Sequence, residues 1–130
     1  MKRVEFTIKT APRTKKNSQV LKYNSKEKKV VAIPSKAYRD YERKAEPYMT
    51  DILKLQLMAL KPPFNVKALF YMDTRRRVDL VNLEQALCDL LVHYRMIPDD
   101  NSGIIKAMDG SRVLYDKDDP RTEVTIEEMR

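Results

Sequence analysis

The 130-residue sequence contains few cysteines, histidines and glycines, and each shortage excludes a class of site. A single cysteine, Cys88, allows neither an intramolecular disulfide nor a cysteine-cluster zinc site, and the one histidine makes zinc a poor fit. Two glycines cannot build a P-loop or a dinucleotide fingerprint, so we expect no nucleotide cofactor. No apolar run is long enough for a signal peptide or for a membrane span, which takes roughly 20 apolar residues. We therefore expect a cytoplasmic protein with no membrane partner.

Positive charge is abundant by contrast. The chain has 26 lysines and arginines against 19 acids, which gives a net charge of +7. Such a surplus favours a polyanionic partner, above all nucleic acid. The alternative is that the basic surface binds an acidic protein instead of nucleic acid. The length fits one domain covering residues 1–130.

The hydrophobic pattern predicts an α+β (mixed α/β) fold with two main helices on a mixed sheet. Alternating or continuous apolar runs predict strands at 2–10, 20–24, 30–34, 66–72, 104–108, 111–115 and 122–128. Helices are expected from Lys36 to about Leu60, after the N-cap Ser35, and from Asp79 to about Tyr94. The first helix should bury a stripe made of Tyr38, Tyr41, Ala45, Tyr48, Ile52, Leu55 and Ala59. Pro47 should kink that helix or divide it in two.

Acids and arginines gather in the segment "YMDTRRRVDLVNLEQALCDLLVHYRMIPDDNS", residues 71–102. Asp73 ends the predicted central strand, Asp79 begins the second helix, and Asp99 and Asp100 follow that helix. An N-cap role, in which the carboxylate accepts hydrogen bonds from free backbone N–H groups, would by itself explain Asp79. It would not explain the neighbouring acids.

A hard metal ion is the ligand that these acids suggest. Asn82 follows Asp79 by three residues and shares its helical face. Clusters of carboxylate and amide oxygens suit Mg²⁺ or Mn²⁺. The helix spans roughly 24 Å, so the chain at residues 98–105 would have to return for Asp100 to approach Asp79.

Cations in two loops are candidates for binding phosphate. The three consecutive arginines and the N-terminal loop "RTKKNSQ" give the set Arg75, Arg76, Arg77, Arg13, Lys15, Lys16 and Asn17. Carboxylates that hold Mg²⁺ beside arginines are what phosphodiester hydrolysis requires. The alternative for the arginines is a solvated loop that pairs with its own acids.

The sequence resembles the RusA family of Holliday-junction resolvases, the crossover junction endodeoxyribonucleases often encoded by prophages. The stretches that carry the resemblance are "RRRVDLVNLEQALCDLL", "IPDD", "APRTKKNSQ", "SKAYRDYE" and "RTEVTIEE", which together cover about residues 11–127. The resemblance implies a homodimer that makes paired, Mg²⁺-dependent nicks in four-way DNA junctions. Asp79, Asn82, Asp99 and Asp100 match the family pattern, and Asp100 is the essential acid of its pair.

Two positions depart from the family. A metal-binding aspartate falls at Val81 and a lysine falls at Gln85, and neither replacement can do the original chemistry. Asp73, and after it Glu84, are the candidate replacement carboxylates, and one of the arginines could stand in for the lysine. The resemblance thus implies catalytic Asp79, Asp100 and Asp73, and a wider set of metal ligands that adds Asp99, Asn82 and Glu84. The alternative is a branched-DNA binding protein that has lost catalysis.

Overall fold

The structure is a computed structural model that describes residues 2–15 and 19–129, and the side chains at 19–22 and 31–34 fall outside the description. The elements in chain order are β1 (Arg3–Ile8), β2 (Gln19–Asn24), β3 (Lys29–Pro34), α1 (Lys36–Ala45), η2 (Glu46–Tyr48), α2 (Asp51–Met58), β4 (Phe64–Met72), α3 (Leu80–His93), β5 (Ile105–Ala107), β6 (Arg112–Tyr115) and β7 (Arg121–Glu128). The α+β class and the mixed sheet are confirmed.

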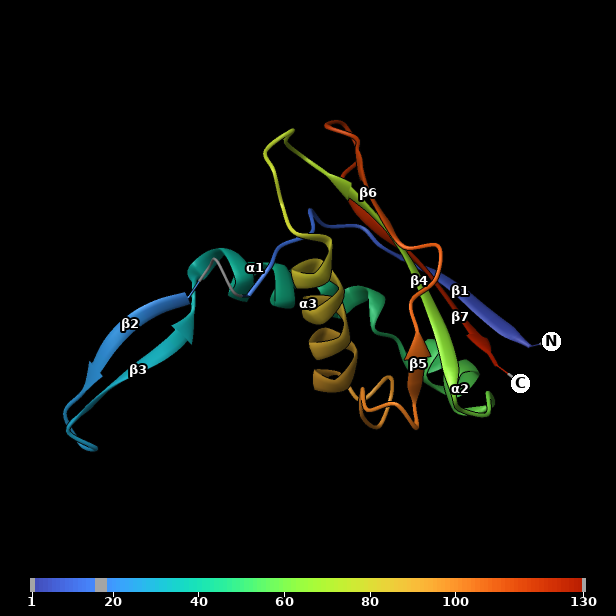
Figure 1. The fold of residues 1–130 in the computed structure, drawn as a ribbon, viewed down its shortest axis with the longest axis horizontal. Helices are drawn as coiled ribbons and strands as arrows, with labels where there is room; N and C mark the ends of the chain where they lie inside the picture. Colours follow the sequence, from blue (N-terminus) through green and yellow to red (C-terminus); the bar gives the residue numbers. More distant parts are fainter. Residues whose placement is uncertain (1, 16–18, 130) are drawn as a thin grey trace.

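The main sheet is centred on β4 and β7 (Figure 1). β7 lies between β1 and β4 and is antiparallel to both, while β5 and β6 pair with β4 in parallel. The sheet is therefore joined by strands from both ends of the chain.

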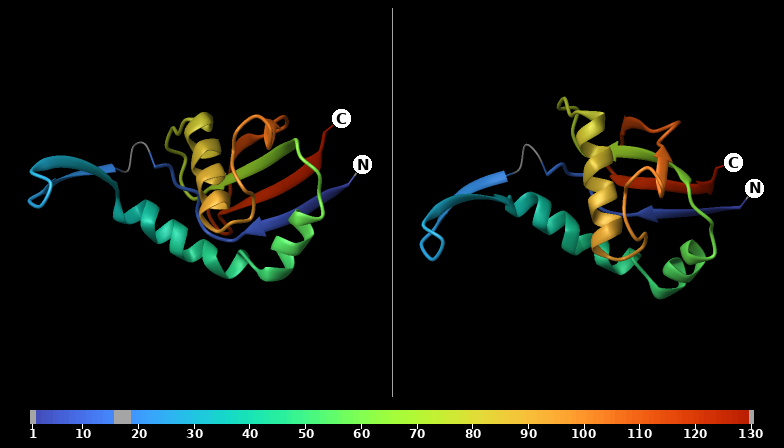
Figure 2. Two further views of the ribbon diagram at one scale, coloured as in Figure 1. Left: turned by 90° about the horizontal axis from the view of Figure 1, so that it is seen from below. Right: turned by 60° about the horizontal axis from the view of Figure 1, so that its bottom comes forward.

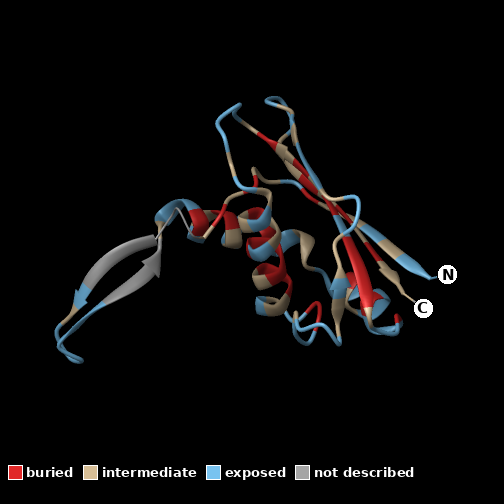
Figure 3. Cartoon of the chain, viewed as in Figure 1, coloured by how far each residue is buried: buried red, intermediate tan, exposed pale blue. Residues whose placement is uncertain are grey.

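One face of the sheet holds the hydrophobic core. Side chains along β4 alternate, so that Val66, Ala68 and Phe70 are buried while Lys67 is exposed. The inward residues of β4 and β7 form one cluster with those of α1, α2 and α3 (Figures 2 and 3). Burial of each large apolar side chain contributes about 1.5–3 kcal/mol. This packing fixes α3, which begins beside the far end of β4.

The first helical region is divided in two at Pro47. The sequence predicted either a kink or a division there, and the structure shows the division. Ser35 caps α1 as predicted, since its hydroxyl accepts a hydrogen bond from the Tyr38 amide at 3.4 Å. The chain then passes through η2, and Thr50 caps α2 in turn. The region thus holds two α-helices, so the described part of the chain has three α-helices in place of the two main ones expected.

The predicted stripe is correct for α1 and wrong for α2. Tyr38, Tyr41 and Ala45 are buried, but Ile52 and Leu55 are 71% and 66% exposed. Leu53 and Leu57 are buried in their place, and Ala59 is exposed as well. The non-helical residues between η2 and α2 shift the helical phase, so the three-and-four spacing cannot continue across them.

The β2–β3 hairpin forms a separate two-stranded sheet that stands away from the rest of the molecule (Figures 1 and 2). Its register pairs Gln19 with Pro34 and Asn24 with Lys29. Among the described residues, no helix is long and apolar enough to cross a membrane.

Candidate active site at helix α3

Asp79 occupies the N-cap position of α3 without capping it. Its backbone carbonyl accepts the amides of Asn82 and Leu83, but its side chain makes no capping hydrogen bond. One carboxylate oxygen instead accepts from the Asn82 side-chain amide at 3.2 Å, and the residue is exposed. The capping interpretation therefore does not account for this carboxylate. It stands at the positive end of a helix dipole, where bound anionic groups are stabilised.

The end of α3 turns the chain back along the helix. The Arg95 amide donates to the Val92 carbonyl and the Met96 amide to the Leu91 carbonyl, which is the hydrogen-bond pattern of a Schellman motif. Arg95 takes the left-handed conformation, with φ of 58°. The following loop then returns Asp100 to α3 at Gln85, and the approach of Asp100 to Asp79 that the sequence interpretation required stays a prediction.

Asp100 meets α3 at Gln85. The Gln85 amide donates to Asp89 at 2.9 Å and to Asp100 at 3.4 Å. The other oxygen of Asp89 lies 3.5 Å from the Lys15 ammonium, which also lies 5.5 Å from the centre of the Tyr38 ring. Two acids therefore contact Gln85, and a cation from the N-terminal loop contacts one of these acids, Asp89.

The acids near this network differ in how freely they can bind a ligand. Asp99 accepts hydrogen bonds from the Asp100 amide at 2.7 Å and the Asn101 side chain at 2.9 Å, which hold its pKa below the usual range. Burial raises the pKa of Glu84. Burial, followed by the charges of Asp100, Asp89 and Glu84, raises the pKa of the Cys88 thiol to about 12. Cys88 is thus a core residue rather than a nucleophile.

Asp73, the expected replacement carboxylate, is paired with Arg13. The guanidinium donates to both carboxylate oxygens at 2.9 Å, in the bidentate geometry typical of strong ion pairs. This hydrogen bonding holds the pKa of Asp73 below its ordinary value. Asp73 would have to leave Arg13 before it could bind a metal, and Arg13 would have to leave Asp73 before it could bind a phosphate.

The arginine loop lies at the same end of the sheet. Arg75 stacks over the Tyr115 ring of β6 at 4.0 Å, while Arg76 and Arg77 are exposed. Among the described residues, no acid lies within ion-pairing distance of these three side chains. The structure therefore does not support the alternative in which the three arginines pair with acids of their own loop.

The described residues contain no group of three acidic, histidine or cysteine side chains close enough to share a metal ion. Asp79 contacts Asn82, whereas Asp100 contacts Gln85. Val81, at the position of the family aspartate, is 71% exposed and lies one helical turn or less from Asp79. An apolar side chain therefore faces solvent where a metal ligand would be expected.

Sequence reasoning missed three contacts of this site. The hydrogen bond of Gln85 with Asp89 was not among the expectations, and the pairing of Arg13 with Asp73 joins residues 60 positions apart. Lys15 was expected to bind phosphate, and nothing in its local sequence indicates a pairing with Asp89. Lys16 and Asn17, also expected to contact DNA, lie outside the described residues.

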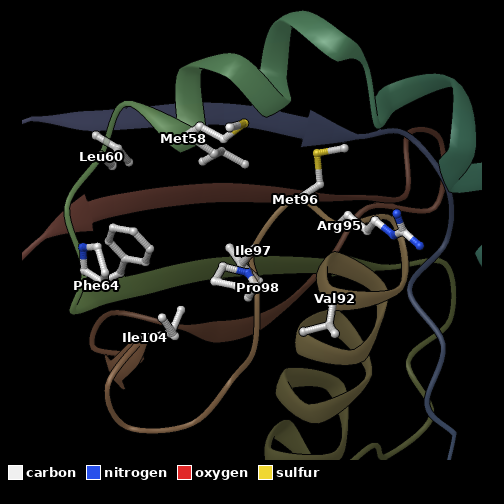
Figure 4. Close-up of a pocket in the computed structure, with 11 residues that line it drawn as sticks. Met58, Leu60, Phe64, Val92, Arg95, Met96, Ile97, Pro98 and Ile104 are labelled. Atoms are coloured by element: carbon white, nitrogen blue, oxygen red, sulfur yellow. The ribbon is translucent and has the colours of Figure 1, made fainter.

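An apolar cavity of about 700 Å³ lies away from these acids, between α2, the start of β4 and the end of α3 (Figure 4). Its lining includes Met58, Phe64, Met96 and Ile104, with Arg95 as the one charged residue among those that line it. The cavity offers no carboxylate and therefore no part of the chemistry considered above.

Comparison with known proteins agrees with the arrangement of these motifs. No curated protein matches the sequence. A family model described as Endodeoxyribonuclease RusA matches residues 6–127, which is nearly the whole chain. The matched range contains Asp79, Asp100, the arginine loop and the described part of the N-terminal loop. The chain therefore belongs to the RusA family of endodeoxyribonucleases, which resolve Holliday junctions.

Proposed function

We propose that this protein is a catalytically competent, metal-dependent resolvase that cuts four-way DNA junctions by paired nicks and acts as a homodimer. The observation that carries the proposal is the state of Asp79, a carboxylate at a helix N-terminus whose side chain makes no capping bond. A carboxylate that does not cap the helix is available to bind a ligand. Asp100, returned to the same helix and held by one hydrogen bond of 3.4 Å, is the second such acid.

The donor chemistry of these residues fits Mg²⁺ or Mn²⁺. Mg²⁺ is commonly held by only one or two carboxylates, together with substrate phosphates and waters, so three protein acids are not required. Asp79 and Asp100 would hold it, and Asn82 would orient Asp79 through the 3.2 Å bond between them. When bound, such an ion supplies an activated water and stabilises charge on the attacked phosphate.

The remaining site candidates support the reaction less directly. Asp73 is available only if DNA draws Arg13 away, and Asp99 only if its loop opens. Burial raises the pKa of Glu84, and a bound cation would oppose that shift. We propose these three acids as auxiliary ligands.

The cations would position the DNA. Arg76 and Arg77 are exposed beside the start of α3 and can donate to phosphate oxygens. Lys15 already lies beside Asp89 and would supply the positive charge that Gln85 lacks. The sequence interpretation gave this replacement to an arginine, and the 3.5 Å contact favours Lys15.

The second candidate is a junction-binding protein without catalysis. Exposed Val81, in place of a carboxylate, is the observation that favours it. Cleavage of a labelled four-way junction with Mg²⁺ or Mn²⁺ separates the two, with Asp79→Asn and Asp100→Asn variants run beside the unaltered protein. Symmetric nicks that both variants lose support the resolvase. Tight binding without nicks at any metal concentration would instead support the binding protein.

A further inference from the structure

We propose that the β2–β3 hairpin is a DNA-gripping arm that lies along a duplex arm of the junction and contacts its phosphates. This inference rests on the proposed function, because it needs a junction as the ligand. The hairpin stands away from the body of the molecule (Figures 1 and 2). Each strand has six residues, so the arm extends roughly 20 Å.

The hairpin on its own is a poorly covered structure. Two-stranded hairpins are marginally stable in water without a third strand or a packed helix. Tyr23 and Val30 lie directly opposite each other in the register, and they remain 65% and 61% exposed. A partner that lies against the hairpin would explain why its apolar side chains are exposed.

The tip of the hairpin carries a positive charge in a fixed turn. The side-chain oxygen of Asn24 accepts hydrogen bonds from the Lys26 and Glu27 amides, at 3.0 and 3.2 Å. Lys28 takes the left-handed conformation, with φ of 52°. Lys29 pairs with Glu27 at 3.1 Å, but both side chains are more than half exposed, so this ion pair is weak. The tip therefore presents three exposed lysines against one acid.

Charge decides which partner fits. A second copy of this chain carries a net charge of +7 and so attracts the lysines of the arm less than a polyanion does. A DNA duplex presents one negative charge per about 1.7 Å of its axis, which attracts the three lysines at the tip. Lysine is a point charge without a planar fork, so we assign the arm to phosphate contacts rather than to base reading.

The arm begins where the candidate active site ends. The chain leaves the site through Arg13, paired with Asp73, and Lys15, paired with Asp89, and then enters the hairpin after residues 16–18. DNA that is cut at α3 would therefore have an outgoing duplex arm beside the hairpin. The arm would lengthen the footprint by about six base pairs, since 20 Å spans six steps of 3.4 Å.

The test is a salt titration of junction binding by full-length protein in EDTA, which separates binding from cleavage. The variant Lys26→Gln/Lys28→Gln/Lys29→Gln neutralises the tip. The control Lys2→Gln/Lys61→Gln/Lys106→Gln removes the same charge from exposed lysines outside the hairpin. We expect the tip variant to lose about two to three units of the log–log salt slope, and on the order of tenfold in affinity near 0.1 M salt. The control should lose less than one unit.

Four other results would overturn the inference. An unchanged slope in the tip variant would exclude the contact, and equal losses in both variants would reduce it to net charge. A change in the mass of the tip variant in solution, with DNA affinity following the mass, would assign the hairpin to a second copy. If the unaltered protein itself fails to bind a junction, the proposed function fails together with the arm. If the unaltered protein binds the junction and the tip variant binds it equally well, only the proposed role of the hairpin is excluded.

Discussion

The acids at the end of the sheet and the acids along α3 are held in different ways. Asp73 and Asp116 accept arginine hydrogen bonds of 2.9 Å, from Arg13 and Arg121 respectively. Asp79 and Asp100 accept only side-chain amide bonds, of 3.2 and 3.4 Å. The first pair hold strands and loops together, and the second pair can exchange their contacts for a ligand at little cost. Within one charged surface, hydrogen-bond geometry therefore separates acids held by arginines from acids held by side-chain amides.

The largest effect should come from an acid that is loosely held. We expect Asp79→Asn to lower junction cleavage on the order of 1,000-fold, because several kcal/mol of charge stabilisation depend on a metal ligand. Stability should change by less than about 0.5 kcal/mol, because the side chain makes no capping bond and asparagine is an equally good N-cap. Single-turnover cleavage and thermal unfolding measure the two, with exposed Asp118→Asn as the control. An Asp79→Asn variant that cuts normally, or one that unfolds, would contradict the distinction between loosely and tightly held acids.

A tightly held acid should show the reverse pattern. We expect Asp73→Asn to lower the free energy of unfolding by about 1–2 kcal/mol near neutral pH, since it breaks a bidentate, partly exposed ion pair. The folded-state pKa of Asp73 is depressed, so this stabilisation is complete above the unfolded-state pKa of about 4. It is lost as the pH falls through the folded-state pKa. Urea unfolding should show the gap between variant and unaltered protein closing in acid, and a gap independent of pH would contradict the assignment.

Val81 offers a way to sharpen the comparison by adding an acid. We expect Val81→Asp to raise cleavage on the order of tenfold at limiting metal, because it places a further carboxylate beside Asp79. Folding should tolerate it, since the side chain is 71% exposed and an acid in the first turn of a helix stabilises it by about 0.3–1 kcal/mol. Ile52→Asp is a matched control, because Ile52 holds the corresponding position of α2 and is equally exposed. Activity that stays absent after this change would favour the binding protein.

The smallest effect should come from the stacked arginine. Tyr115→Leu removes the ring beneath Arg75 and frees the arginine loop, which should weaken junction binding by two- to fivefold, or about 0.5–1 kcal/mol. Tyr115→Phe keeps the ring face beneath Arg75, so this variant should bind the junction as tightly as the unaltered protein. Fluorescence anisotropy with a four-way junction gives the affinities. Equal losses in both variants would show that the hydroxyl, and not the ring, matters.

Much of the fold followed from local periodicity. The alternation in β1 and β7, the apolar run of β4 and the leucines of α3 are patterns that burial on one face imposes within a few residues. The exposed Ile52 of α2 was missed because the short non-helical break before it resets the helical phase, and the length of such a break is not encoded in spacing.

The site was predicted less completely, for a physical reason. The positions of Asp79 and Asp100 followed from their places at the two ends of a helix. Their partners did not, because ion pairs such as Arg13 with Asp73 form between distant segments that only the sheet brings together. Local sequence carries no signal for a contact that depends on the folded chain.

The place of β7 has a consequence for how the protein is made. Among the described elements, β7 joins β1 to β4 and comes last in chain order. A ribosome therefore synthesises all the candidate acids before the strand that joins the sheet exists. The nascent chain holds Asp79 and Asp100 without the framework that positions them, and long-range strand pairing of this kind is slow. Under the proposed function, nuclease activity should then arise only after synthesis has passed Glu128, and a chain still attached to the ribosome should not cut DNA.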